Sequence, residues 1–222
     1  MSKLLIAVKS CVQHLDLGYH NVLRETWAKD ANLAGIDVRF FVGPNIHKQE
    51  PDEVMLDCPD DYENLPKKTQ AICKWAIGKT YSHIFLCDTD TFLIPSKLLA
   101  CGFEKYDYTG KIDRPSGESF PYKTISREGV IEDHPRCLPW ASGGYGYFLS
   151  RKGFSAIAST FPLGWAEDLW VGNILQNMYI ADEATILNTP GGVYSWHFPA
   201  HVYKSGYDLS FGWMEKMYQE QK

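Results

Sequence analysis

A short apolar run that ends in two aspartates constrains this chain more than any other feature. Residues 83–87 predict a buried strand, and Asp88-Thr89-Asp90 follows directly. A strand end presents side chains on a rigid edge, and cations such as Mg²⁺ and Mn²⁺ bridge carboxylates to diphosphate oxygens. The pattern therefore favours an α/β fold with a metal and phosphate site at one sheet edge. Paired aspartates also cap helices and shape turns, so neighbouring motifs have to decide between these interpretations.

Strands and helices alternate along the chain in the manner of a mostly parallel central sheet flanked by helices. Apolar spacing predicts strands over 3–9, 37–43, 53–57 and 83–87, and helices over 17–30, 66–78, 151–159 and from Glu167-Asp168 to about residue 177. Residues 101–139 are rich in Gly, Pro and charge and predict loops and short strands near a cleft. No linker is visible, so we expect a single domain over 1–222, with a nucleotide-binding half (about 1–100) and an acceptor or catalytic half (about 101–222).

Composition narrows the class of protein. The chain has 222 residues, 45% of them hydrophobic, and a formal net charge of -5, which argues against non-specific nucleic-acid binding. No run approaches the roughly 18 apolar residues of a membrane span, so we expect a soluble protein. The 6 cysteines form no C-x-x-C pair, which disfavours zinc. Reduced thiols are expected, with a Cys58–Cys73 bridge as the alternative for a secreted domain. The oligomeric state is open.

Several motifs occur in a fixed order. They are Arg24-Glu25-Thr26-Trp27, residues 61–69 (Asp-Tyr-Glu-Asn-Leu-Pro-Lys-Lys-Thr), Asp88-Thr89-Asp90-Thr91-Phe92, Ala141-Ser142-Gly143-Gly144-Tyr145-Gly146-Tyr147, Glu167-Asp168-Leu169 with Gly172, and Ser195-Trp196-His197-Phe198. The ordered set resembles the inverting beta-1,3-glycosyltransferases that include Fringe and the core 1 galactosyltransferase. The chain departs from that family at Thr89, which replaces an acid, and at Tyr145, which replaces a small residue.

The resemblance implies a GT-A type fold and a metal-dependent inverting transfer from a nucleotide-sugar, a UDP-sugar with Mn²⁺ or Mg²⁺, to an acceptor hydroxyl on a glycan or glycoconjugate. Asp90 would bind the metal directly, and Asp88 would contact it through water or hold the ribose. His197 would be the third ligand, with His201 as its substitute, although a histidine packed among aromatic residues is the alternative. No Golgi anchor precedes residue 1, so the expected location is cytoplasmic for a complete chain and the Golgi lumen for a trimmed catalytic domain.

The same resemblance assigns the remaining roles. Asp168 would be the general base, kept ionised by backbone amides at a helix start, and Glu167 would support it or contact the donor sugar. The alternative is that both acids cap a helix. The expected nucleotide pocket comprises Ser10, Arg24, Asp61, Lys68, Asp88, Thr89, Asp90, Gly143, Gly144 and Glu167. Gly143 and Gly144 would allow close backbone approach or form a plain turn. Trp140, Tyr145 and Trp165 are candidates for stacking on sugar rings.

Two other classes of function remain open. A metal-dependent phosphodiesterase or nucleotidyltransferase also uses paired aspartates, but it usually gathers more carboxylates or histidines around two metals. A catalytically silent carbohydrate-binding module on the same fold would need neither a metal site nor a base. The donor sugar and the acceptor are not readable from the sequence, because they depend on single contacts in loops.

Overall fold

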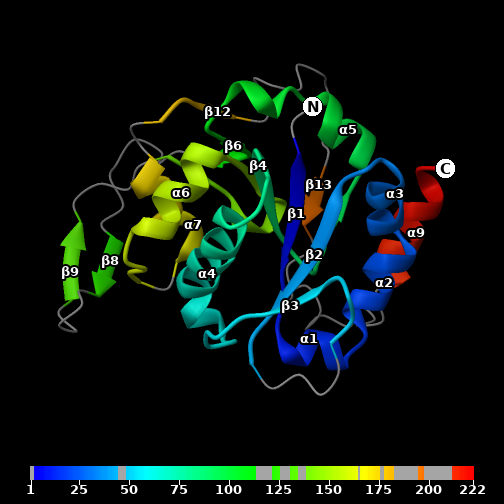
Figure 1. Ribbon diagram of the computed structural model, residues 1–222, viewed down its shortest axis with the longest axis horizontal. Coiled ribbons are helices and arrows are strands. Elements are labelled where there is room, and N and C mark those ends of the chain that lie inside the picture. The colour runs from blue at the N-terminus through cyan, green and yellow to red at the C-terminus, as the bar shows by residue number, and fades with distance from the viewer. Residues whose placement is uncertain are drawn as a thin grey trace.

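The computed structural model describes residues 3–44, 49–113, 122–125, 131–134, 139–164, 166–175, 178–182, 195–197 and 212–222. Figure 1 shows a central twisted sheet with helices packed against both of its faces. The described helices include none long and apolar enough to cross a membrane.

The main sheet has seven strands in the order β12-β6-β11-β4-β1-β2-β3. Their bounds are β1 Leu4–Lys9, β2 Asp37–Val42, β3 Glu53–Met55, β4 His83–Asp88, β6 Tyr108–Gly110, β11 Tyr147–Ser150 and β12 Ile180–Asp182. β1 pairs in parallel with both β2 and β4, whereas β11 runs antiparallel to β4 and β6. The predicted α/β class with a mostly parallel sheet is confirmed.

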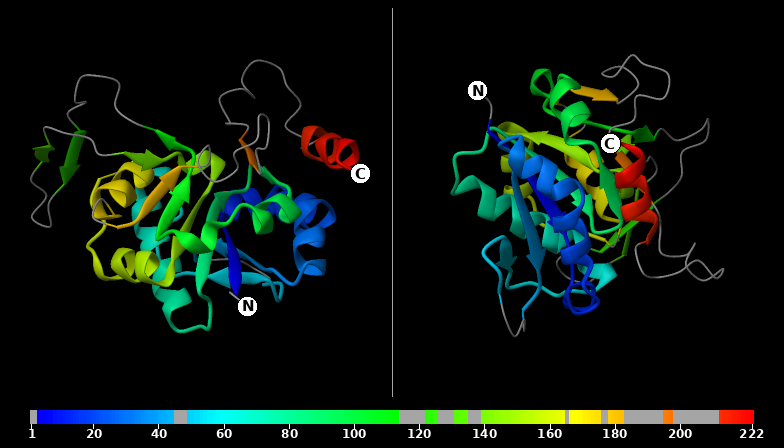
Figure 2. Two further views of the ribbon diagram at one scale, coloured as in Figure 1. Left: turned by 90° about the horizontal axis from the view of Figure 1, so that it is seen from above. Right: turned by 90° about the vertical axis from the view of Figure 1, so that its right-hand side faces the viewer.

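Helices from different parts of the sequence cover the two faces of the sheet. One face carries α2 (Tyr19–Glu25), α3 (Trp27–Leu33), α5 (Pro95–Ala100) and the last helix, α9 (Gly212–Glu220). The opposite face carries α4 (Leu65–Ile77), α6 (Arg151–Ser159) and α7 (Glu167–Leu175). Both views of Figure 2 place α9 beside α2 and α3, where the Tyr218 hydroxyl donates to Asp30 Oδ1 at 2.9 Å. The C-terminal helix therefore belongs to the same layer as the N-terminal helices α2 and α3.

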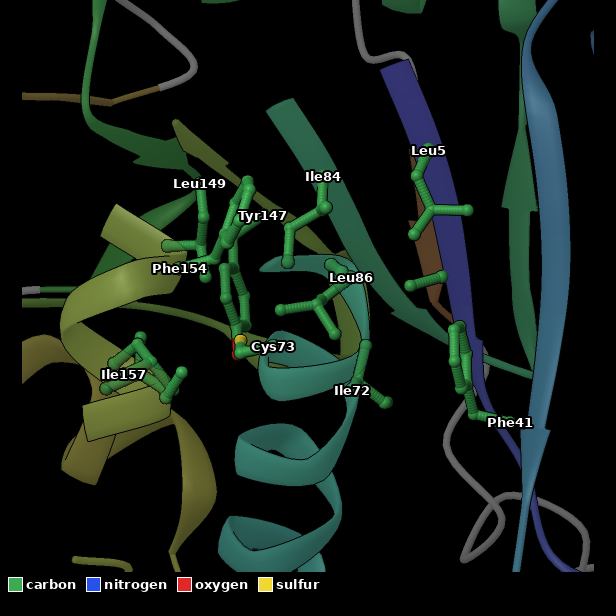
Figure 3. Packing of buried hydrophobic residues seen from close by; sticks show 14 of the residues in the cluster. Leu5, Phe41, Ile72, Cys73, Ile84, Leu86, Tyr147, Leu149, Phe154 and Ile157 are labelled. Carbon is green, nitrogen blue, oxygen red and sulfur yellow. The ribbon is translucent and has the colours of Figure 1, made fainter. Parts of the chain in front are cut away.

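Alternate side chains of the strands face the two helical layers and separate the core into two clusters. Leu5 of β1 and Leu86 of β4 face α4, where they meet Ile72 and Cys73 (Figure 3). Ile6 and Val8 point to the other face, toward Trp27 of α3. Burial of large apolar side chains contributes about 1.5–3 kcal/mol each, so both layers hold the sheet in place.

Short strands and turns complete the described part. β5 (Thr91–Leu93) pairs with β13 (Ser195–His197), β7 (Ile112–Asp113) with β10 (Trp140–Ala141), and β8 (Tyr122–Ile125) with β9 (Ile131–His134). Two 3-10 turns, η1 (Tyr62–Asn64) and η3 (Gly143–Tyr145), border the site described below, and a third, η2, covers Phe103–Lys105. Short strands within 101–139 agree with the sequence prediction.

The predicted helix over 17–30 is wrong. The structure instead has two helices here, α2 and α3, separated at Thr26, and Gly18 separates α2 from the preceding α1 (Val12–Asp16). Gly18 adopts a φ of 82°, which a continuing helix does not allow. The Thr26 hydroxyl donates to the Val22 carbonyl oxygen at 2.7 Å, a bond that bends helices. The other predicted elements are confirmed with small shifts, the strand at 53–57 being shorter.

The cysteines that were considered for a bridge are not joined. Cys58 and Cys73 are both free and buried. Reduced thiols, the expectation for this chain, therefore hold among the described residues, and Cys73 serves as an apolar core residue of α4.

Candidate active site

A cleft of about 840 Å³ lies at the carboxyl ends of β1 and β4. This edge is where ligands bind in open α/β sheets, because the loops that follow the strands diverge there. Its lining residues are Lys9, Ser10, Cys11, Gln13, His14, Asp60, Asp61, Tyr62, Leu65, Lys68, Asp88, Thr89, Asp90, Trp140, Ser142, Gly143, Gly144, Ala166, Glu167, Asp168 and Leu169. Most of the predicted site residues therefore meet in one cleft.

The turn that carries the paired aspartates is held by its threonines. The Asp88 backbone N–H donates to Thr91 Oγ1 at 3.1 Å, and Thr91 in turn donates to the Gly144 carbonyl oxygen at 2.9 Å. Thr89 Oγ1 lies 2.7 Å from His14 Nδ1. These bonds attach the turn to η3 and α1, so Asp88 and Asp90 are presented to the cleft by a fixed backbone.

The aspartate turn offers two of the oxygen ligands that a hard cation needs. Asp88 and Asp90 both line the cleft and offer carboxylate oxygens, the ligand type that Mg²⁺ and Mn²⁺ prefer. Among the described residues no three His, Cys, Asp or Glu side chains converge as a metal site. The backbone of His197 pairs with Thr91 in the β5–β13 ladder, but its side chain lies outside the described residues, as does all of His201. Two carboxylates with substrate phosphates and water are a common Mg²⁺ environment.

A buried lysine joins the aspartate turn to the helix of the candidate base. Lys9 Nζ lies 3.3 Å from Asp88 Oδ1 and 3.2 Å from Glu167 Oε2. Burial would lower the pKa of Lys9, but the charges of Asp88 and Glu167 outweigh that cost and raise it, so the ammonium stays charged. Lys9 and Asp88 face each other in the parallel register of β1 and β4. Lys9 was not predicted as a site residue, because it ends an otherwise apolar strand.

Glu167 is an anchor inside the protein. Its Oε1 accepts hydrogen bonds from the Thr69 hydroxyl, at 2.7 Å, and from the Tyr147 hydroxyl, while Oε2 faces Lys9. The residue is only 5% exposed. Because both carboxylate oxygens are engaged by α4, β11 and β1, these contacts favour the supporting role over direct contact with a sugar.

Asp168 occupies the next position at the start of α7 and faces the cleft. The Gly143 N–H donates to its Oδ2 at 3.3 Å and the Leu169 N–H to its Oδ1 at 2.9 Å. Such amides favour the ionised form of the acid, as expected from the sequence. Burial and the charge of Glu167 instead outweigh them and raise the pKa of Asp168. A carboxylate with a raised pKa is the stronger base.

Lys68 and Asp60 form the floor of the cleft beside β1. Lys68 Nζ donates to the Ser10 carbonyl oxygen and to Asp60 Oδ1. Asp60 also accepts the Val12 N–H at 2.6 Å and the Gly43 N–H at 2.8 Å. The predicted residue, Asp61, lines the cleft but caps η1 by accepting the Asn64 N–H at 3.0 Å. Asp60 directly precedes the motif of residues 61–69, and this position next to Asp61 was the signal that could have found it.

Arg24 lies away from the residues that line the cleft. Its Nη2 donates to Asp52 Oδ1 and to Glu53 Oε1, both at 2.7 Å, and its Nε donates to Asp52 Oδ2 at 2.9 Å. Glu53 also lies 2.9 Å from His20 Nδ1, and His20 Nε2 lies 2.7 Å from Ser10 Oγ. Of this chain of contacts, only Ser10 lines the cleft.

Some of the predicted glycines and aromatic residues line the cleft and others do not. Gly143 and Gly144 line the cleft, and a Cβ on Gly143 would lie 3.3 Å from Glu167 Oε2, so a larger residue would crowd the anchor. Trp140 also lines the cleft. Tyr145 is not among the lining residues, and Lys111 Nζ lies 4.1 Å from its ring centroid. Trp165 lies outside the described residues.

The cleft carries a strong excess of negative charge. Six carboxylates and two lysines line it, which gives a formal charge of -4 with histidine neutral. Burial lowers the pKa of His14, so this side chain adds no positive charge at neutral pH. A diphosphate would meet repulsion here unless a cation entered with it.

Comparison with known proteins shows the family of this chain. The family model described as Galactosyltransferase matches residues 19–185, about three quarters of the chain. This chain belongs to the galactosyltransferase family. A member of the galactosyltransferase family is a glycosyltransferase, with a sugar donor and an acceptor as its substrates. The matched region of the family contains Lys68, the aspartate turn and Asp168. No curated protein sequence matches the chain.

Solved structures show similarity at low identity. The 4-diphosphocytidyl-2C-methyl-D-erythritol synthase of Anaerococcus prevotii is 11% identical, with a TM-score of 0.49 over 82% of this chain and 86% of that one. HddC of Yersinia pseudotuberculosis is 11% identical, with a TM-score of 0.47 over 98% of this chain and 100% of that one.

Proposed function

We propose that this galactosyltransferase-family chain is a metal-dependent inverting glycosyltransferase. It moves a sugar from a nucleotide-sugar, a UDP-sugar by the family resemblance, to an acceptor hydroxyl on a glycan or glycoconjugate. One observation carries the proposal: the aspartate turn and Asp168 line the same cleft, and the pKa of Asp168 is raised. A base and an anion-binding cation site within one cleft are what a single displacement at an anomeric carbon needs.

The chemistry assigned to Asp168 is proton removal. The acceptor O–H gives its proton to the Asp168 carboxylate as the acceptor oxygen forms a bond to the anomeric carbon. The bond from that carbon to the diphosphate oxygen breaks on the opposite side, and the nucleoside diphosphate leaves. The Gly143 and Leu169 amides fix the carboxylate in the cleft, which keeps the base oriented toward an acceptor.

Charge balance supports the need for a cation. A divalent ion held by Asp90, and by Asp88 directly or through water, would supply positive charge opposite the departing diphosphate. Asp90 is the candidate for direct binding by the family resemblance, and Lys9 Nζ, 3.3 Å from Asp88 Oδ1, would share Asp88 with the ion. His197 remains the proposed third ligand, because its backbone lies opposite Thr91, next to Asp90. Lys68 sits on the same side of the cleft as Ser10 and would help to neutralise the donor.

Titration tests the donor half of this proposal. UDP is titrated into the purified protein with and without Mn²⁺, and a panel of UDP-sugars follows. Tight binding that requires the metal is the expected result. Asp90→Asn should weaken that binding at least tenfold, since it removes a charged ligand. The exposed Glu215→Gln should bind as the native chain does. UDP affinity that changes neither with Mn²⁺ nor in Asp90→Asn would contradict the proposed binding of a metal by Asp90.

Turnover tests the base. Asp168→Asn keeps the shape of the side chain but cannot accept the proton, and we expect transfer to fall by about 10²–10⁴-fold with UDP affinity nearly intact. Initial rates of sugar transfer measure the first quantity and calorimetry the second. Unchanged turnover in Asp168→Asn would show that another residue is the base. A catalytically silent sugar-binding module would bind the UDP-sugar, but neither the native chain nor the variant would transfer the sugar.

A further inference from the structure

A continuous line of hydrogen bonds leads from the partly exposed Arg24, outside the cleft, to one hydroxyl inside it. Arg24 Nη2 donates to Glu53 Oε1, which lies 2.9 Å from His20 Nδ1, and His20 Nε2 lies 2.7 Å from Ser10 Oγ. His20 is 1% exposed, and its ring stacks on Phe40 with centroids 4.4 Å apart. The imidazole therefore has no freedom to turn.

The charges along this line fix where each proton lies. Burial opposes ionisation of Glu53, but hydrogen bonds from the Glu50 N–H, His20 and Arg24 prevail and lower its pKa, so the carboxylate has no proton. Burial, the largest influence, lowers the pKa of His20, so its ring carries a single proton at neutral pH. That proton has to lie on Nδ1, because Glu53 can only accept. Nε2 is then an acceptor.

Ser10 consequently gives its only proton to the protein. Its Oγ–H donates to His20 Nε2, and the other protein atom within reach of Oγ, the Cys11 carbonyl oxygen at 3.4 Å, is also an acceptor. Among the described residues no N–H or O–H donates to Ser10 Oγ, although this residue lines the cleft. The hydroxyl presents lone pairs, and no hydrogen, to a ligand.

We propose that Ser10, with His20 and Glu53 as positioning residues, is a specificity determinant that accepts one hydrogen bond from the nucleoside part of the donor. Phosphate oxygens carry no proton at this position and would repel the hydroxyl lone pairs, so the diphosphate lies elsewhere. The partner is an N–H or O–H: the imide N–H of uracil, which cytosine lacks, or a ribose hydroxyl. The inference rests on the proposed use of a uridine nucleotide and deepens it.

Nucleotide analogues test the inference in the unmodified chain. With Mn²⁺ present, calorimetry compares UDP with CDP, N3-methyl-UDP, 2′-deoxy-UDP and 3′-deoxy-UDP. A base contact weakens CDP and N3-methyl-UDP by about tenfold, and a ribose contact weakens one deoxy analogue by the same factor, as expected for one lost hydrogen bond. Equal affinity for UDP and all four analogues overturns the inference. Absence of any UDP binding would instead count against the proposed function.

Ser10→Ala then tests whether Ser10 makes the hydrogen bond that the sensitive analogue has lost. The variant should lose about tenfold for UDP and show no further loss for the sensitive analogue, because the two changes remove the same bond. Ser96→Ala, a serine-to-alanine change on the exposed face of α5, serves as the control and should keep the native preference. A preference that persists undiminished in Ser10→Ala shows that another residue makes the contact and overturns the assignment.

His20→Gln tests the positioning role. Glutamine can still donate to Glu53, but it cannot hold an acceptor against Ser10 in the geometry of the ring. The Ser10 hydroxyl can then turn its proton into the cleft, so the ratio of affinities between UDP and the sensitive analogue should fall toward one. A purely structural role for His20 would weaken every nucleotide by the same factor and leave that ratio unchanged.

Discussion

Two clusters of charged residues in the described part of the chain lie against opposite faces of the sheet, and they relate to the cleft in different ways. The central cluster, Lys9 with Glu167, Thr69 and Tyr147, packs under α4 and α7 and sits directly behind the aspartate turn and the candidate base. The flanking cluster, Arg24 with Asp52, Glu53 and His20, packs beneath α2 and reaches the cleft only through Ser10. A charged residue from a family motif can therefore either form part of the site, as Glu167 does, or only orient one of its groups, as Arg24 does.

The largest effect is expected in the central cluster. Glu167→Ala leaves Lys9 buried with Asp88 as its remaining charged partner, and it removes the acceptor for Thr69 and Tyr147. Breaking a buried pair in this way costs about 3–5 kcal/mol in the free energy of unfolding. Urea unfolding followed by circular dichroism measures the loss, with Glu215→Gln as the exposed control. A loss below about 1 kcal/mol would show that water or local rearrangement replaces the anchor.

A smaller effect is expected in the flanking cluster. Arg24→Ala leaves Glu53 with its bonds from His20 and Glu50, so we expect a loss of about 1–3 kcal/mol at neutral pH. The pKa of Glu53 is lowered in the folded chain, so its contribution is present above the unfolded value of about 4.3 and is lost as pH falls through the folded value. The difference between Arg24→Ala and the native chain should therefore shrink in acid. Unfolding curves at several pH values measure it, and a constant difference would contradict the ionic role.

The smallest effect concerns the pH at which the enzyme works. Burial and the Glu167 charge raise the pKa of Asp168, and a base works only when deprotonated, so kcat/KM should fall on the acid side at a pH above the ordinary aspartate value of about 3.9. Glu167→Gln removes one of those causes and should move this limb to lower pH, whereas Arg24→Ala should leave it in place. If the acid limb of kcat/KM stays at the same pH in Glu167→Gln, then ionisation of Asp168 does not control that limb.

Much of the fold follows from local patterns, whereas the links between segments do not. Strands β1, β2 and β4 and helix α4 were predictable because their apolar period is uninterrupted. The break of the first helix was not, because the apolar period continues across Gly18 and Thr26 while the backbone does not. Small polar and glycine residues decide such breaks through hydrogen bonds that a hydrophobic pattern does not contain.

The candidate site divides in the same manner. The family motifs were enough to select Asp88, Asp90 and Asp168, which the cleft brings together. Lys9 acquires its position from the register of β1 against β4, which no local spacing reveals. His20 of α2 and Glu53 of β3 are 33 residues apart in the sequence, so their link to Ser10 depends on tertiary packing.

The strand order also has a consequence for how the chain is made. β4 can pair with β1 as soon as both have left the ribosome, but its other neighbour, β11, begins only at Tyr147. Until then the apolar strand that carries the aspartate turn has one open edge, and open apolar edges recruit other chains. Biosynthesis therefore exposes this enzyme to aggregation for the interval between the two strands, and slower translation or less chaperone during that interval should lower the yield of soluble protein.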